Sequence, residues 1–417
     1  MKSEIEHTST MLGSQNMKSS QRMVSVVEPY ELPEGWKWVQ QNEVCKLTDG
    51  EKRTGTEFPY LEVKYLRGKK EKDFVSTGKF IKAGTKVILV DGENSGEVFT
   101  VPEDGFMGST FKALEISNVN ENYLQYFIHT KKDLYRNNKK GSAIPHLDKK
   151  LFFTMPFPLP PTLAEQQRIV KRIESMFAKL DEAKEKAQNV VDGFETRKAA
   201  ILHKAFTGEL TAKWRKENGV SDDSWVVKTI GECGKWERGR SKHRPRNAPE
   251  LFGGKYPFIQ TGDIANADIY IYEHKQTLSE FGFQQSRLFP KDTLCITIAA
   301  NIGKVAILTY DCCFPDSVVG FTPFENVDSK FMYYKINDMQ KDLEAMAPAT
   351  AQKNLNLKLL TSVSVQIPTL PEQVEIVRIL DIIIEKENKA KQAAEAVLEQ
   401  IDLLKKSILA RAFRGEL

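Results

Sequence analysis

The sequence PTLAEQ, from Pro161 to Gln166, opens a fifty-residue block that closes with AFTGEL, from Ala205 to Leu210. The block recurs without a gap at the end of the chain, from PTLPEQ at Pro368–Gln373 to AFRGEL at Ala412–Leu417. The offset is 207 residues throughout, and 20 of the 50 positions are identical. Two copies of one block, each closing half of the chain, predict a molecule with pseudo-two-fold symmetry. Such a molecule is better suited to binding something twice than to forming a single catalytic pocket.

Each copy of the block is predicted to be one long helix, because its apolar residues recur at alternating steps of four and three, the heptad spacing of a coiled coil. Arg197 in the first copy and Glu387 in the second are out of pattern. The apolar positions of the first copy are Ile169, Ile173, Met176, Leu180, Ala183, Ala187, Val190, Phe194 and Ile201. Those of the second copy are Ile376, Leu380, Ile383, Ala390, Ala394, Val397, Ile401, Leu404 and Ile408.

Both copies carry signals for the start and the end of a helix. A capping box is predicted from Thr162 with Glu165 and from Thr369 with Glu372, and a glycine, Gly208 or Gly415, follows each helix. About 40 helical residues at 1.5 Å each would span roughly 60 Å. A helix of that length needs a partner, and we expect the two copies to pair antiparallel, with the globular segments at opposite ends.

The rest of the chain is organised around these two helices. Short β-rich runs between turn residues predict mixed α/β domains, and Asn94-Ser-Gly-Glu-Val98 matches Asn301-Ile-Gly-Lys-Val305 at the same offset of 207. The domains are therefore expected to be related as well. The predicted boundaries are a disordered tail at 1–30, a first domain at 31–160, a first helix at 161–212, a second domain at 213–367 and a second helix at 368–417.

Positive charge is clustered, although the net charge is only +4. Lys235–Arg246 contains six cations, and Lys64–Lys72 and Lys131–Lys140 contain five each. Any single run could be a solvated loop. Three such runs, all outside the repeated blocks, favour a polyanionic partner.

Several other classes of protein are disfavoured by the composition. No apolar run is long enough to cross a bilayer, and the N-terminus lacks the apolar core of a signal peptide, so we expect a cytoplasmic protein. The five cysteines form no Cys-x-x-Cys pair and the six histidines show no ligand spacing. Reduced, buried thiols are therefore expected rather than a zinc site.

Two α/β domains, each followed by a long helix that begins P-T-L-x-E-Q and ends A-F-x-G-E-L, resemble the specificity subunit of type I restriction–modification systems. The resemblance extends from about Leu32 to Leu417 and includes Gly239–Arg246 and Tyr256–Ile264. It implies two target-recognition domains, each reading half of a split double-stranded DNA site. It also implies that the paired helices act as a ruler between the half-sites. No membrane partner is expected, because no apolar run is long enough to cross a bilayer.

The resemblance implies partners as well. Two modification subunits would dock on the helices, and restriction subunits would add translocation and cleavage. S-adenosylmethionine, ATP and Mg²⁺ would be bound by those partners, and no cofactor would be bound by this chain.

The sequence itself lacks catalytic motifs. It contains neither an Asn-Pro-Pro-Tyr/Phe methylation motif nor a phosphate-binding loop. Asp49 with Glu62 and Lys64 has a spacing that could hold Mg²⁺ in a nuclease, but the equivalent Gln260-Thr261-Gly262 has no carboxylate or lysine. The first alternative is a catalytic DNA-modifying enzyme, a nuclease or methyltransferase, with duplicated DNA-binding domains. The second is a coiled-coil scaffold without DNA contacts.

Candidate DNA-binding residues follow from the rule that phosphate contacts supply affinity and base edges supply specificity. Gln260 is suited to adenine, Thr261 to a thymine methyl group and Glu62 to cytosine. The second-domain cations are Arg238, Arg240, Lys242, His243, Arg244 and Arg246. The first-domain counterparts are Lys52, Arg53, Glu62, Lys64, Tyr65 and Arg67, and a late loop adds Lys353 and Asn354. Metal and catalytic residues are expected to be absent.

Overall fold

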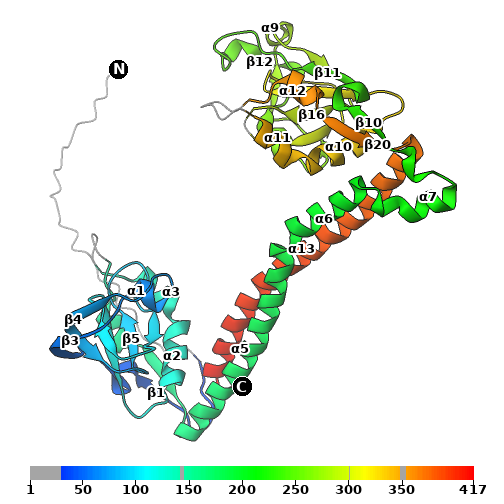
Figure 1. Cartoon of the computed structure of the whole chain (residues 1–417). Helices are drawn as coiled ribbons and strands as arrows, with labels where there is room; N and C mark the ends of the chain where they lie inside the picture. Colours follow the sequence, from blue (N-terminus) through cyan, green and yellow to red (C-terminus); the bar gives the residue numbers. More distant parts are fainter. Residues whose placement is uncertain (1–29, 141–144, 300, 348–353) are drawn as a thin grey trace, which may run out of the picture. The chain divides into compact units, whose positions relative to one another are not determined.

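The computed structural model describes residues 30–140, 145–299, 301–347 and 354–417 (Figure 1). The predicted disordered tail lies outside this part of the chain, apart from Tyr30. Two compact units are present: residues 1–184 with 399–417 form the first, and residues 185–398 form the second. Each unit thus combines one globular domain with parts of both repeated blocks.

The first unit is a mixed α/β structure built on three small sheets. An antiparallel pair is formed by β1 (Lys37–Gln40) and β9 (Pro156–Leu159). The second sheet has the order β2 (Cys45–Thr48), β8 (Phe111–Ile116), β5 (Lys86–Leu89), β6 (Val98–Thr100). In the third sheet each strand pairs with the other two: β3 (Glu51–Leu61), β4 (Phe74–Ile81) and β7 (Gly105–Met107). The helices are η1 (Gln41–Glu43), α1 (Val63–Leu66), α2 (Glu121–Thr130), α3 (Lys132–Asn137) and α4 (Lys149–Phe153).

The second unit has the same mixed character. One sheet has the order β11 (Gly234–Arg238), β19 (Val318–Pro323), β16 (Leu294–Thr297), β17 (Val305–Leu308), β13 (Tyr270–Ile271). Another has the order β14 (Gln276–Leu278), β12 (Phe252–Phe258), β18 (Cys312–Cys313), β15 (Leu288–Phe289), and β10 (Val226–Thr229) pairs with β20 (Ser364–Ile367). The α-helices are α7 (Ala212–Asn218), α8 (Thr261–Asn266), α9 (Glu280–Gln284), α10 (Ser329–Asp338), α11 (Gln340–Met346) and α12 (Leu357–Thr361). The 3₁₀ turns are η2 (Glu209–Thr211), η3 (Asp222–Ser224), η4 (Ile230–Cys233) and η5 (Pro249–Leu251).

The relationship between the two domains is visible in their central hairpins. β5 pairs antiparallel with β6, and β16 pairs antiparallel with β17. The matching turns contain Gly96 and Gly303, with φ of 96° and 80°. Glycine is suited to this left-handed conformation because it has no Cβ. All four residues of β5 and of β16 are buried, including the polar Lys86 and Thr297 at the strand ends.

The end of the chain completes the core of the first unit. Phe413 packs against Tyr123 and Phe127 of α2, with ring centroids 5.0 and 5.4 Å apart. In the second unit Phe206, which matches Phe413 at the offset of 207, packs against Phe331 of α10 at 5.5 Å. Each domain is therefore closed by the end of one helical block.

The second block is a single helix, α13 (Leu370–Phe413), as predicted, whereas the first is divided into α5 (Leu163–Asp192) and α6 (Phe194–Phe206). The division falls at Gly193, whose equivalent in α13 is Gln400. Glycine weakens a helix by about 1 kcal/mol relative to alanine. The Arg197 side chain folds back over Gly193 and donates to the Val190 carbonyl at 2.9 Å. A Cβ at position 193 would lie 2.5 Å from the Arg197 guanidinium, so the glycine makes room for it.

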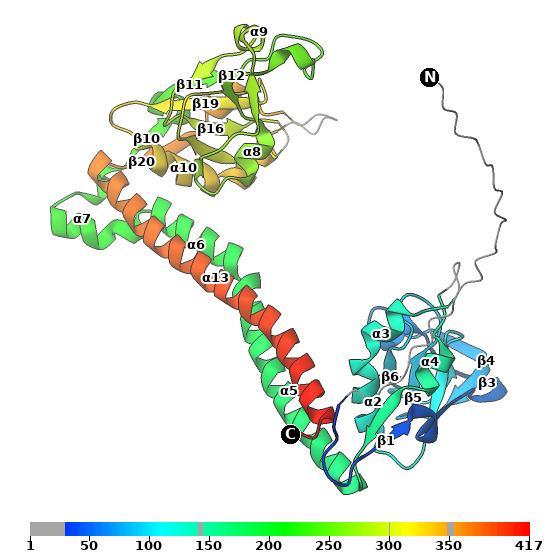
Figure 2. The same cartoon turned by 180° about the vertical axis from the view of Figure 1, so that it is seen from behind.

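The two blocks run antiparallel within each unit, as predicted (Figures 1 and 2). In the first unit Lys184 of α5 lies 4.0 Å from Asp402 of α13. In the second unit Arg197 of α6 forms an ion pair of 2.7 Å with Glu387 of α13. The two residues that were out of the heptad pattern are therefore paired with each other.

The predicted heptad register is followed only in part. Ile376, Leu380 and Ile401 are buried, but Val397 and Leu404 are 39 and 49 % exposed. Each helix also packs against a globular domain, so its buried face is set by two partners. A pattern based on one helix partner does not account for that second contact.

The two predicted capping boxes have different outcomes. In the first block the Thr162 hydroxyl accepts from the Glu165 amide at 3.1 Å, while the Glu165 carboxylate turns to Arg168 at 2.8 Å. In the second block Glu372 is fully buried and does not bond back to Thr369, because its Oε1 serves other donors and its Oε2 has no partner. The predicted bond from the glutamate side chain back to the threonine backbone amide is thus wrong in both copies.

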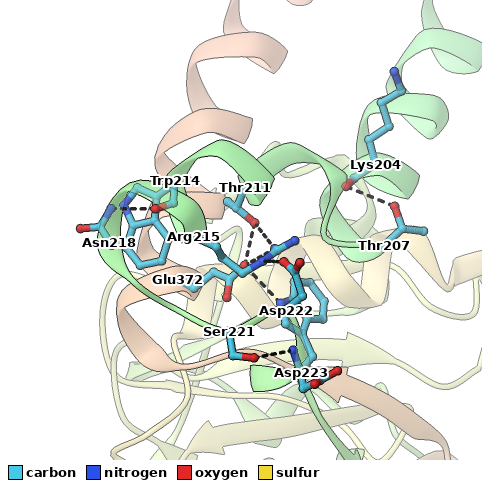
Figure 3. Close-up of polar contacts among 11 residues, drawn as sticks. Lys204, Thr207, Thr211, Trp214, Arg215, Asn218, Ser221, Asp222, Asp223 and Glu372 are labelled. Atoms are coloured by element: carbon cyan, nitrogen blue, oxygen red, sulfur yellow. Dashed lines mark hydrogen bonds and ion pairs between the residues drawn. The ribbon is translucent and has the colours of Figure 1, made fainter.

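Glu372 instead forms the centre of a buried polar cluster, which we call the Glu372 cluster (Figure 3). Its Oε1 accepts from the Thr211 hydroxyl and the Arg215 guanidinium, both at 2.7 Å, and from the Trp225 indole at 3.1 Å. Arg215 also pairs with Asp222 at 2.9 Å. Burial disfavours the charge of Arg215, but its bonds to Glu372 and Asp222 raise its pKa. The cluster ties α7 to the start of α13.

Candidate nucleic-acid interface

The basic loop of the second domain, residues 239–249, follows β11 and is anchored by its backbone. Gly239 passes so close to the neighbouring chain that a Cβ would lie 2.2 Å from the Pro315 carbonyl. The Arg240 amide donates to Phe314 and the Lys242 amide donates to Gln285, each at 3.2 Å. The loop therefore has a defined backbone course.

The side chains of this loop differ in how far the fold already engages them. Arg238, at the end of β11 beside the loop, donates to the Asp316 carbonyl, and Arg246 pairs with the Asp316 carboxylate at 2.8 Å. Arg240 donates to the Gln284 carbonyl at 3.3 Å, yet its buried Nε has no partner. His243 lies 3.6 Å from Glu250. These four side chains are held by the protein.

Lys242 and Arg244 are the available cations of the loop. Both are exposed, and neither forms an ion pair with any residue that the structure describes. Arg244 donates only to the backbone carbonyls of Ser241 and His243, at 2.8 and 2.7 Å. Most of its guanidinium donors are left for a phosphate or a base.

Gln260 and Thr261 lie at the start of α8. Gln260 is the N-cap residue, and its side-chain amide donates to Gln276 at 2.7 Å. A base would have to replace Gln276 as the partner of this side chain. Asn354 is exposed and pairs through its backbone with Ala299, and Lys353 lies outside the described residues.

In the first domain β3 and β4 form a two-stranded ribbon that is exposed over much of its length. Every residue from Glu51 to Glu57 is exposed, so both faces of the strand meet solvent. Lys52 has no ion pair in the described part of the chain. Arg53 pairs with Glu51 and lies 3.9 Å over the ring of Phe80.

The remaining first-domain candidates cluster around α1, and most are engaged. Glu62 accepts from Lys70 at 2.6 Å, Tyr65 donates to Glu103, and Arg67 pairs with Glu97. Lys64 is exposed, and no ion pair connects it to another described residue. Among the predicted DNA-binding residues of this domain, Lys52 and Lys64 are therefore the available cations.

Sequence reasoning missed the second strand of the ribbon. Thr54 of β3 lies directly opposite Thr77 of β4, and both side chains are exposed. The available signal was the β-branched and aromatic content of residues 74–81, which is typical of a strand. A run of this composition carries little positive charge, so charge clustering does not identify it.

The residues of the nuclease alternative do not form a metal site. Asp49 accepts from Lys112 at 2.7 Å and pairs with Lys79, and these bonds lower its pKa to about 2. Glu62 is bound to Lys70 instead. Across the described ranges no group of three or more His, Cys, Asp and Glu residues could hold a metal ion, and all five cysteines are buried and free. No helix in the same ranges is long and apolar enough to span a bilayer.

Two related α/β domains with exposed basic elements, joined to paired antiparallel helices, define a protein that recognises DNA through two domains. The model of the type I restriction modification DNA specificity domain matches residues 33–191 and again residues 222–400. The chain therefore belongs to this family and is a type I restriction–modification specificity subunit with two target-recognition domains. Its function is DNA recognition rather than catalysis.

Similar proteins cover nearly the whole chain. It is 27% identical to the type I restriction enzyme MjaVIII specificity subunit of Methanocaldococcus jannaschii, over 93% of this chain and 94% of that protein. It is 22% identical to the type I restriction enzyme EcoBI specificity subunit of Escherichia coli, over 93% of this chain and 87% of that protein. The HsdS subunit of Thermoanaerobacter tengcongensis has the same fold, with a TM-score of 0.63, 20% identity and coverage of 94 and 99%. A solved structure of a type I restriction–modification system gives a TM-score of 0.73 at 20% identity, over 93% of this chain and 100% of that chain.

Proposed function

We propose that each domain binds one half of a two-part site in double-stranded DNA, and that exposed, unpaired cations hold the phosphates. The observation that carries this assignment is the contrast within each basic element. Most arginines there are bound to the fold, whereas Lys52, Lys64, Lys242 and Arg244 remain exposed. Exposed cations near a rigid backbone supply affinity and register on DNA.

Base reading in the first domain is assigned to the β3–β4 ribbon. The major groove of B-DNA admits a two-stranded β-ribbon. Thr54 and Thr77 face each other across this ribbon, and a threonine can offer its methyl group to thymine or its hydroxyl to a base edge. In the second domain the Gln260 side chain would release its hydrogen bond to Gln276 and bind adenine instead.

The partners follow from membership of a type I system. Two modification subunits would dock on the helices, and restriction subunits would join that complex. S-adenosylmethionine, ATP and Mg²⁺ would be bound by these partners, and the complex would act in the cytoplasm.

The paired helices would set the gap between the two half-sites. Arg197 and Glu387 support this role because they align the two helices in one register. A polar pair within an otherwise apolar helix contact specifies register.

The experiment compares DNA binding by the purified chain with that of a double variant, Lys242→Ala with Arg244→Ala, over a series of salt concentrations. We expect weaker binding and a salt slope reduced by about 0.9 for each phosphate that the loop no longer binds. The control is Lys213→Ala, because Lys213 is exposed on α7 and already pairs with Glu217 at 3.6 Å. An unchanged slope in the double variant would exclude this loop from the DNA surface.

A further inference from the structure

A cavity of about 480 Å³ lies in the first unit, between the junction of α2 with α3 and the last turns of α13. Its floor is apolar and includes the buried rings of Phe127 and Phe413 beside Leu409. Its walls carry one carboxylate, Asp133, and five cations: Lys131, Lys132, Arg136, Lys406 and Arg414. Three of these cations come from a basic run that the DNA interface does not use.

The five cations outnumber the carboxylates near them, which are Asp133 in the same cavity and Glu93, whose pKa Arg136 helps to lower. None of them forms an ion pair with a residue in the described part of the chain. Lys131 lies over the ring of Phe127 at 5.3 Å, and Arg414 lies over Tyr30 at 5.5 Å. Burial lowers the pKa of Lys131, so its charge is partly desolvated without compensation. An anion bound in the cavity would reduce the repulsion among the five cations. It would also offset the cost of desolvating the Lys131 charge.

The second unit provides an internal comparison. Lys131 ends α2 and begins α3, and Met339 holds the same place between α10 and α11. When Lys131 is aligned with Met339, Lys132 corresponds to Gln340 and Arg136 corresponds to Glu344.

The helical block shows the same difference. At the offset of 207, Lys406 and Arg414 correspond to Ala199 and Thr207, while the floor residues Leu409 and Phe413 correspond to Leu202 and Phe206. The apolar floor is thus common to both units. None of these four cations has a cation at its corresponding position in the second unit, where Lys335 lies over Phe206 at 4.5 Å and pairs with Asp338. Packing of the helices does not require the four cations.

The arrangement of the cations indicates the shape of the occupant. Lys406 and Ala410 of α13 and Arg414, the residue that directly follows this helix, form one row, because residues four apart lie on the same face. Eight residues at 1.5 Å each separate the two charges by about 12 Å along the helix, and the small side chain of Ala410 leaves room between them. A cavity of this volume accepts a few amino-acid residues but is too small to admit a duplex.

We propose that this cavity binds an acidic segment of a partner protein, with carboxylates on both walls and an apolar side chain against Phe127 and Phe413. The site is distinct from the DNA contacts proposed above and occurs once per chain. The Asp133 carboxylate at the rim would disfavour a segment whose charges are placed differently.

The test uses the full chain and a labelled peptide of about twelve residues, with glutamates four residues apart and leucines between them. Binding is followed by fluorescence anisotropy, and the same peptide with glutamine in place of glutamate serves as the ligand control. We expect the acidic peptide to bind more tightly than the glutamine peptide, and its affinity to fall as salt is raised.

The variant Lys406→Glu with Arg414→Glu should weaken peptide binding about tenfold or more, because two attractions become repulsions. Both side chains are exposed and break no ion pair, so the unfolding temperature should change little. The matched control is Lys179→Glu with Lys386→Glu, two exposed lysines at equivalent positions of the two blocks and away from the cavity. This control should bind the peptide as the unmodified chain does.

Three results would overturn the proposal. The first is equal binding of the acidic and glutamine peptides. The second is a loss of DNA binding in the Lys406→Glu, Arg414→Glu variant with unchanged peptide binding, which would make the cavity part of the DNA surface. The third is peptide binding only after removal of residues 1–28, which would make the chain's own N-terminal segment the occupant. DNA binding by the Lys406→Glu, Arg414→Glu variant is measured in parallel. Failure of the proposed DNA contacts can then be distinguished from failure of the cavity proposal.

Discussion

Replacement of Glu372 by leucine should destabilise the second unit mainly by leaving the Arg215 guanidinium without its buried partner. Glu372 is fully buried, and the Arg215 side chain that it binds is 9 % exposed. Removing one partner of a buried ion pair costs about 3–5 kcal/mol. We expect the lower end, about 3 kcal/mol, because Arg215 keeps its bond to Asp222, which is 88 % exposed. For a unit of this size, that loss lowers the midpoint of thermal unfolding by about 6–12 °C.

The internal repeat supplies the control for this experiment. Glu165 occupies the equivalent position in the first block, but it is 30 % exposed and pairs with Arg168 one helical turn away. Surface pairs of this kind contribute about 1 kcal/mol or less, so Glu165→Leu should shift the unfolding midpoint by under about 4 °C. Both variants are compared by circular dichroism during heating.

A second comparison separates the ion pair from general damage to packing. Arg215→Met with Glu372→Leu replaces the pair by apolar side chains, and such replacements are often neutral. We therefore expect this double variant to recover most of the stability that Glu372→Leu loses. If the double variant were as unstable as the sum of its single changes, or if Glu165→Leu cost as much as Glu372→Leu, the reasoning would be refuted.

Four further predictions concern function and acid stability. The isolated chain should neither methylate nor cut DNA, and methylation should return when a modification subunit is added; sustained turnover by the chain alone would contradict this. Inserting four residues after Ala183 and four after Asp402, at matched positions because Lys184 lies 4.0 Å from Asp402, should lengthen the gap between half-sites by roughly 6 Å, as read by sequencing of methylated sites. Replacing residues 213–367 by the domain of a related subunit should change one half-site only, and linked changes in both would indicate a composite surface. The lowered pKa of Asp49 means that its bonds to Lys79 and Lys112 stabilise the fold above the ordinary carboxyl range and are lost as the pH falls toward about 2; Asp49→Asn should remove this acid-dependent part, under about 1 kcal/mol at so exposed a site.

The helical framework was predictable because it is written twice in the sequence. Repetition at a fixed offset and apolar spacing identified both long helices and their antiparallel pairing. The two residues that broke the pattern, Arg197 and Glu387, proved to be partners. Their pairing could have been inferred from opposite charges at the two interruptions.

The partners of individual side chains were harder to predict from the sequence. Glu372 fits a capping box by its spacing, yet a hydroxyl, a guanidinium and an indole compete for it, and these come from residues up to 161 positions away. Likewise, the positive runs were visible in the sequence, but ion pairs to Glu97 and Asp316 decide which cations remain free. Such pairings depend on the folded chain, so a count of charges cannot supply them. The assignments of individual DNA-binding residues stay predictions.

The closure of the first domain by the end of the chain has a consequence for synthesis. The first helical segment of this core ends at Lys184, but Phe413 and Leu409 lie in the second helical block, which is made only after the whole second domain. At about 5–20 residues per second, the first domain exposes the apolar surface of α2 for roughly 10–45 s before its final core residues exist. The second domain has no such delay, since Phe206 precedes it in the chain. The domain that is made first is thus the last to be completed, and it is the one that most needs protection while translation continues.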